Sequence, residues 1–283
     1  MKKSISAKIG TGFLSVLIFL IAICFLLPFV VMVISSLKPE EAIFDPLFPP
    51  NIQYLDNYKA AFSSPTFLSS FFNSIIVCVV TLLGLVILAS MAGYAVTRSK
   101  KRIFKVTYVI FAITLIIPMQ ANMVFLYQLG TAFNLINTLA FLILINISGN
   151  ISYSSLIYSG FVKSIPREVE EAAMIDGCGT FSSFFNIVFP LLRPATGTVI
   201  VIELLWYWND YQGPLIYLPG GQVKTLMLEI SQFKSYIQNT SFVTTAWAPV
   251  SAICVIATLP VVIFFICTQK SMLKGLTAGS VKG

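Results

Sequence analysis

The sequence predicts an all-α integral membrane protein with six transmembrane helices. Of its 283 residues, 57% are hydrophobic and only 10% are charged, a composition too apolar for a water-soluble fold. Six apolar runs each exceed the roughly 20 residues that a helix needs to cross about 30 Å of hydrocarbon. The whole chain, 1–283, is expected to form one transmembrane domain, with spans near residues 9–37, 71–97, 104–129, 138–162, 194–218 and 246–269.

The basic residues predict the orientation of the chain. Six spans put both termini on the same side. Placing the termini in the cytoplasm puts fourteen of the 18 Lys and Arg residues inside and four outside, and cytoplasmic loops generally carry such an excess. Two outer segments follow from this orientation, residues 39–70 and 219–245. They are expected to be lids, docking surfaces or plain connectors.

A polar stretch, residues 163–193, lies between the fourth and fifth runs and is predicted to be cytoplasmic. It begins with a short predicted helix from Pro166 to Asp176. Proline suits a first helical turn because its missing N–H has no partner there in any case, and Gly177 can end the helix in a left-handed conformation. Small and apolar residues are predicted to share one face, which a partner could approach closely: Ile165, Val169, Ala172 and Ala173.

A second short helix is predicted to follow, with Thr180 as its N-cap. Aromatic and apolar residues recur in it at helical spacing, which suits a helix at a membrane surface. These residues are Phe181, Phe184, Phe185 and Val188.

Polar side chains inside the predicted spans are candidates for a transport path, because ionisable groups in a membrane are costly and usually face protein or water. In the third run, Pro118 is followed by Gln120 and Asn122. Gly213-Pro214 is expected to break the fifth run. The fifth run carries carboxylates and aromatic rings that suit sugar hydroxyls and sugar faces, unless the carboxylates are paired inside the bundle: Glu203, Trp206, Tyr207 and Asp210.

Several functional classes are disfavoured by what the sequence lacks. It contains no His, and its five Cys are not spaced as in a zinc site or a disulfide framework. No Gly-x-x-x-x-Gly-Lys-Ser/Thr run occurs, so binding of ATP through a P-loop is not expected. We therefore expect no metal site and no catalytic residue set in this polypeptide, and we do not interpret it as an enzyme.

The polar stretch resembles the EAA loop of ABC-importer permease subunits. The matching residues are Glu171-Ala172-Ala173, Gly177, Ile187 and Phe189-Pro190, where the family has Leu in place of Phe189. Further stretches are similar to the carbohydrate-uptake, maltose-type branch, and the C-terminal tail is similar to that of the smaller of two paired permeases. These stretches are Asn73-Ser74-Ile75, Ala92-Gly93-Tyr94-Ala95 with Arg98, Leu135-Ile136-Asn137-Thr138, and Trp208-Asn209-Asp210.

This resemblance implies a permease domain with a cytoplasmic coupling helix between helices 4 and 5. The coupling residues would be Glu171, Ala172, Ala173, Asp176 and Gly177. It also implies a multi-pass protein of a bacterial inner membrane, surrounded by lipid and without nucleic acid. Its implied partners are a second, different permease, two ATPase subunits that hold ATP and Mg, and an extracellular solute-binding protein. This chain itself would bind no cofactor.

The resemblance favours a sugar or oligosaccharide as the imported solute. A polyol, a glycerophosphate or another small solute remains an alternative. An ion-coupled secondary transporter that uses Glu203 and Asp210 remains a second alternative, and a membrane scaffold without cargo a third.

Overall fold

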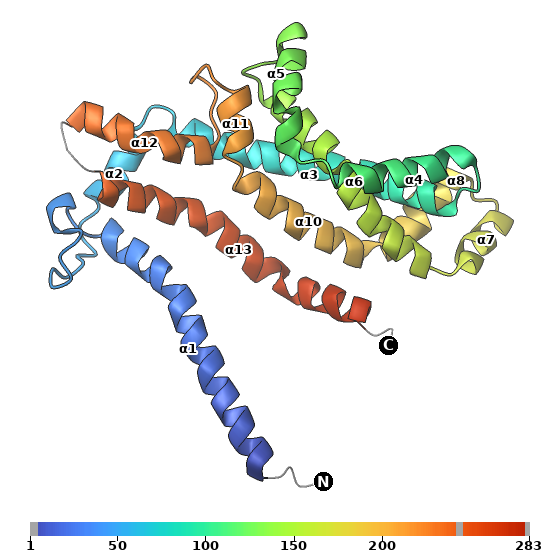
Figure 1. Ribbon diagram of the computed structural model, residues 1–283, viewed down its shortest axis with the longest axis horizontal. Helices are drawn as coiled ribbons and strands as arrows, with labels where there is room; N and C mark the ends of the chain where they lie inside the picture. The colour runs from blue at the N-terminus through green and yellow to red at the C-terminus, as the bar shows by residue number, and fades with distance from the viewer. Residues whose placement is uncertain (1–4, 242–245, 281–283) are drawn as a thin grey trace. The chain divides into compact units, whose positions relative to one another are not determined.

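The computed structural model describes residues 5–241 and 246–280, and every regular element in those ranges is helical (Figure 1). Within them, four helices are long and apolar enough to cross a membrane. Two further helix pairs, each bent at a short break, qualify if each pair counts as one span, which gives up to six. The predicted all-α membrane fold is therefore confirmed. The four unbroken helices are α1 (Ile5–Ser36), α3 (Phe67–Arg98), α6 (Leu139–Ser164) and α13 (Trp247–Ser280).

The third predicted run is broken at Pro118, as the sequence indicates. It comprises α4 (Arg102–Thr114), the single turn η2 (Met119–Asn122) and α5 (Met123–Ala132). The two halves are bent by 101°. Pro118 has no N–H to continue the helical hydrogen bonds, and its extended backbone (φ −65°, ψ 133°) starts η2 instead.

The second bent pair consists of Thr180–Leu191 and Arg193–Trp208, which are bent by 72°. The fifth predicted run breaks after this pair, a few residues before Gly213-Pro214. Helix α10 (Arg193–Trp208) ends first, and α11 (Gln212–Tyr217) begins after a gap of three residues. A proline ring clashes with the carbonyl four residues earlier, so the helix must end before Pro214 rather than at it. The Asp210 carboxylate then accepts a hydrogen bond from the Gly213 N–H at 3.0 Å.

The chain groups into two compact units, Met1–Phe67 with Ile230–Leu259, and Leu68–Glu229 with Pro260–Gly283. The single domain expected from the sequence stays a prediction. Helix α12 (Leu226–Ser241) contributes to both units.

In the first unit, hydrogen bonds tie the predicted outer segment to the ends of two helices. Asn57, on the short helix α2 (Asp56–Ser63), donates to the carbonyls of Ser36 and Lys38 at 2.9 and 2.8 Å, just after α1. Glu40, on the turn η1 (Glu40–Ala42), accepts from the first N–H groups of α13, those of Trp247 and Ala248. A carboxylate at a helix N-terminus is favoured by the helix dipole, so this part of the outer segment is anchored at both helix ends.

In the second unit, α11 packs against α5 and α6. The rings of Phe141 and Tyr217 meet edge to face there, with centroids 5.6 Å apart. The buried core around them consists of Val77, Phe141, Leu142, Ile145, Tyr217, Leu218 and Leu228.

Helices α3 and α6 approach each other closely at Gly93. A Cβ atom built on Gly93 would lie 2.7 Å from the Ser155 carbonyl oxygen and 2.7 Å from the Tyr158 Cβ. Gly93 therefore allows two backbones to pack at a distance that any side chain would prevent, which is how small residues serve membrane helices.

We expect Gly93→Ala to destabilise the protein by about 1–3 kcal/mol, the usual cost of overpacking a filled contact. The measurement is the midpoint of thermal unfolding of the purified protein in detergent. Gly160→Ala is the matched control, since Gly160 is on α6 and exposed, with no atom within 4 Å of an added Cβ. This control should unfold at the wild-type temperature or above it. An equal loss in both variants would contradict the close approach.

Candidate functional site

The inter-span segment, residues 163–193, begins with the predicted short helix. Helix α7 runs from Arg167 to Ile175, with Pro166 as its N-cap. Its C-terminus closes on Gly177, which has a φ of +84°. The Cys178 N–H donates to the Ala173 carbonyl and the Gly177 N–H donates to the Met174 carbonyl, at 2.9 and 3.1 Å. This pair of bonds defines a Schellman motif, so the predicted left-handed cap at Gly177 is confirmed.

Helix α7 is anchored to the end of α3 by the carboxylate of Glu170. Glu170 is only 5% exposed. Its Oε1 accepts from Arg98 Nε at 2.7 Å and its Oε2 accepts from the Tyr94 hydroxyl at 2.7 Å. Arg98 also donates to the Ile165 carbonyl at 2.8 Å. Both carboxylate oxygens are therefore satisfied, and the ion pair fixes α7 against a predicted membrane span.

This anchor decides which residues of α7 are exposed. Ala173 is buried, whereas Glu171, Ala172 and Asp176 are exposed. The predicted shared face of Ile165, Val169, Ala172 and Ala173 is therefore wrong: Ala173 packs inward while Val169 and Ala172 face outward. The exposed face has the helical spacing i, i+3, i+4, i+7 and consists of Glu168, Glu171, Ala172 and Ile175.

The second short helix is less regular than predicted. It consists of α8 (Thr180–Ser183), a π-helical turn η3 (Phe184–Val188) and α9 (Phe189–Leu191). The N-cap is Gly179 and not Thr180, and no side chain caps the helix. The aromatic stripe is divided, since Phe184 and Val188 are buried while Phe181 and Phe185 are exposed.

The six candidates for a transport path do not form one surface. Glu203 is 1% exposed and accepts from the Ser154 hydroxyl of α6 at 3.1 Å. Tyr207, one turn later, is also buried, with its hydroxyl 3.5 Å from the Asn146 carbonyl. For Glu203 the geometry thus favours a carboxylate held inside the bundle over one that lines a sugar path.

Trp206 and Asp210 line an open cavity of about 560 Å³ at the end of α10. Trp206 is 70% exposed, and Asn209, Tyr211 and Gln212 contribute polar groups to the same cavity. Asn122 lies in another cavity, of about 260 Å³, with Ser148 and Ser152 of α6, while Gln120 is exposed on η2.

Sequence reasoning missed four residues that organise this site. Tyr94 and Arg98 belong to a stretch that matched the family, but their role as partners of Glu170 had no signal beyond their i, i+4 spacing at a span end. No local pattern distinguishes Glu170, which is buried, from Glu171 beside it, which is exposed. Ile175 is 86% exposed at the end of α7, and such an exposed isoleucine can be found only in the folded chain.

Comparison with known proteins identifies the family to which this chain belongs. The family model described as "Binding-protein-dependent transport system inner membrane component" matches residues 85–274, and the chain belongs to this family. It is thus a transport component and a multi-pass membrane protein.

Individual relatives narrow the resemblance. The chain is 34% identical over 266 residues to the melibiose/raffinose/stachyose import permease protein MelC of Bacillus subtilis, covering 93% of this chain and 94% of MelC. It is 34% identical over 256 residues to the probable starch degradation products permease protein AmyC of Thermoanaerobacterium thermosulfurigenes, covering 90% and 91%. The predicted resemblance to carbohydrate-uptake ABC permeases is confirmed.

A solved structure supports the fold. A chain of a bacterial ABC transporter involved in the import of the acidic polysaccharide alginate superposes with a TM-score of 0.80 at 21% identity, covering 95% of this chain and 99% of that one. At this level of identity the match concerns the fold alone.

We expect Glu170→Gln to loosen α7, because Arg98 would be left without its carboxylate in a largely buried position. Backbone amides of α7 should exchange with deuterium at least about tenfold faster, equivalent to about 1.4 kcal/mol of lost local stability. Glu171→Gln removes the same charge from the neighbouring exposed position and should leave the exchange unchanged. If both variants exchange at the wild-type rate, Glu170 is not the anchor of α7.

Proposed function

We propose that this chain is a permease subunit of an ABC importer that moves a sugar or oligosaccharide across the bacterial inner membrane. Two separate ATPase subunits hold ATP and Mg, and this chain binds neither. The family match and the sugar-transport names of its relatives support the cargo class. The observation that carries the mechanism is the exposed face of α7, held in place by the buried pair of Glu170 and Arg98.

The face of α7 has the character of a docking helix. Ala172 offers almost no side-chain bulk, so a groove on an ATPase can approach the helix backbone. Glu171 and Asp176 supply negative charge at the rim, and Ile175 supplies an apolar contact. Small and apolar residues at the centre with charges at the rim are typical of protein interfaces.

ATP-driven closure of the ATPases would displace α7. Because Glu170 joins α7 to Arg98 at the end of α3, the displacement would be passed to a membrane span and not absorbed by a loop. Alternation between outward-open and inward-open states then follows as a population shift driven by nucleotide binding on the partners.

The path for the sugar is proposed to run along the cavity that contains Trp206 and Asp210. Its wall is an exposed surface of this chain, and a second, different permease would close it. The indole ring suits the apolar face of a sugar, and Asp210, Asn209 and Gln212 suit its hydroxyl groups. A further feature is consistent with a partner: in α1 no residue of the most apolar 18-residue window is buried within this chain.

An extracellular solute-binding protein is the proposed source of substrate. One structure similar in fold, with a TM-score of 0.62 and 15% identity, is described as a bacterial alginate transporter in complex with an alginate pentasaccharide-bound periplasmic protein. The outer segments of this chain, including the anchored residues around Asn57 and Glu40, are the proposed contact surface.

We expect Ala172→Arg to abolish ATP-dependent uptake, because a long charged side chain on the exposed face would keep α7 out of a close-fitting groove. The measurement is uptake of labelled raffinose by cells that express the complete importer, with the amount of protein in the membrane determined by immunoblot. Met174→Arg is the matched control. Met174 is 52% exposed on the same helix but lies off that face, so uptake should be largely retained.

Normal uptake by the Ala172→Arg variant, at normal amounts in the membrane, would overturn the coupling assignment. Transport by this chain alone in vesicles, driven by an ion gradient without any ATPase, would instead establish the ion-coupled alternative.

We expect Trp206→Ala to reduce uptake about tenfold, equivalent to about 1.4 kcal/mol of lost sugar binding, while thermal stability is unchanged because the ring is exposed. Glu203→Ala should behave in the opposite way. Its removal leaves Ser154 without its partner in a buried position, which costs about 1–3 kcal/mol of stability. Uptake assays and unfolding midpoints, compared for the two variants, test this division. A stable Glu203→Ala protein with impaired uptake would place Glu203 in the path.

A further inference from the structure

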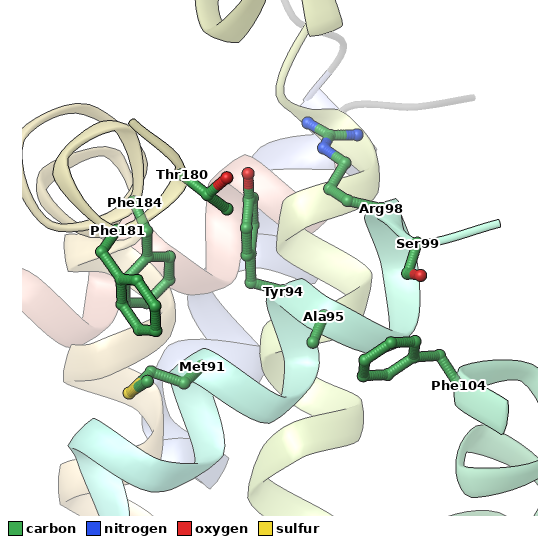
Figure 2. A pocket seen from close by; sticks show the side chains of 9 residues that line it. All are labelled: Met91, Tyr94, Ala95, Arg98, Ser99, Phe104, Thr180, Phe181 and Phe184. Carbon is green, nitrogen blue, oxygen red and sulfur yellow. The ribbon is translucent and has the colours of Figure 1, made fainter. Parts of the chain in front are cut away.

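A third cavity, separate from the proposed path, lies beside the anchor of α7. It has a volume of about 350 Å³, within the range of about 300–1,000 Å³ that small-molecule sites occupy. Figure 2 shows that α3 contributes one wall, with the start of α4 and the start of α8 around it. The lining residues are Met91, Tyr94, Ala95, Arg98, Ser99, Phe104, Thr180, Phe181 and Phe184.

The interior of this cavity is apolar. Phe184 is a buried part of the cavity wall, whereas Phe181 is 70% exposed at its rim. Arg98, the one charged residue of the lining, is already engaged by Glu170 at the end of α3. A free water-soluble metabolite would find few hydrogen-bonding partners here, whereas a hydrocarbon chain would fill the space.

The position of the cavity and the charges around it indicate which kind of molecule would carry the hydrocarbon chain. The cavity lies where the apolar helix α3 ends and α4 begins, and the end of a spanning helix is expected at the boundary between membrane and water. Four further basic residues follow Arg98 within seven positions, all exposed, and the stretch from 98 to 105 contains no acidic residue. In the part of the chain that the structure describes, none of these four forms an ion pair: Lys100, Lys101, Arg102 and Lys105.

Two of these cations occupy the first turn of α4, at Arg102 and Lys105. Positive charge at a helix N-terminus is opposed by the helix dipole, so these residues do not serve the stability of the helix. An anionic group bound between them and the apolar cavity would relieve this repulsion.

We propose that the cavity holds one acyl chain of an anionic phospholipid whose phosphate is bound by the basic residues at the start of α4. Basic pockets next to membrane helices recognise anionic headgroups in this way. The lipid would lie against Tyr94, whose hydroxyl donates to Glu170 of α7, so the bound molecule would contact the anchor of the candidate docking helix.

Photocrosslinking in native membranes tests this proposal with the full chain in its assembled state. Phe181 is replaced by p-benzoylphenylalanine, and the covalent adduct is identified by mass spectrometry of the intact protein. The expected product carries phosphatidylglycerol or cardiolipin, enriched about fivefold over phosphatidylethanolamine relative to the lipid extract of the same membranes.

Two double variants of the protein that carries p-benzoylphenylalanine test whether the basic residues cause the preference for anionic lipid. Arg102→Gln with Lys105→Gln should bring the adducts back to the composition of the extract. Lys59→Gln with Arg193→Gln removes two charges from other exposed positions and should preserve the enrichment.

The alternative occupant would be an apolar side chain from another subunit, and this would appear as a crosslink to protein. That result, or lipid adducts without preference for anionic headgroups, would overturn the proposal.

Discussion

The buried carboxylate of Glu170 is the interaction on which the arrangement of the inter-span segment depends. It lies between Arg98 and Tyr94, with Arg98 on one oxygen and the Tyr94 hydroxyl on the other. Breaking a buried ion pair by removing one partner is far more costly than the pair itself is favourable, so this contact acts mainly as a geometric constraint. Helix α7 cannot turn about its axis without exposing Glu170 and burying Glu171. The outward position of Ala172 is therefore a consequence of a residue two positions earlier.

A second constraint comes from backbone hydrogen bonding in a membrane. A spanning segment must satisfy its own N–H and C=O groups, and breaks are tolerated only where protein or a water-filled cavity compensates. The break at Pro118 and the break before Pro214 both follow from proline, and both adjoin cavities, one lined by Met119 and Asn122 and the other by Asn209 and Asp210. At the second break Asp210 replaces the missing helical bond by accepting from Gly213. The irregular backbone and the open, polar surfaces thus have a common cause.

Much of the fold was predictable because its signals are local. Apolar runs identify the spans, a glycine in the left-handed conformation ends α7, and Pro118 breaks the third run. The candidate site was less predictable because helical phase is set by distant partners. Glu203 and Trp206 are three residues apart, yet α6 buries the first and leaves the second exposed. Similarly, Asn73 and Ser74 bind backbone groups of Lys224 and Leu226, and Asn137 accepts from Gly220. No local pattern indicates contacts across such separations.

One turn of α3 contacts both α7 and the π-helical turn of the inter-span segment. Arg98 contacts the carbonyl that follows α6 and the carboxylate of α7, and the ring of Tyr94 lies 5.1 Å from that of Phe184 in the π-helical turn. Two residues at the end of a long helix therefore hold both α7 and the π-helical turn, and α7 also packs against α8 and that turn. A packed interface of this kind moves as a unit and does not deform gradually. If a partner displaces α7, the end of α3 must move with it, and the close contact at Gly93 carries that motion from α3 to α6.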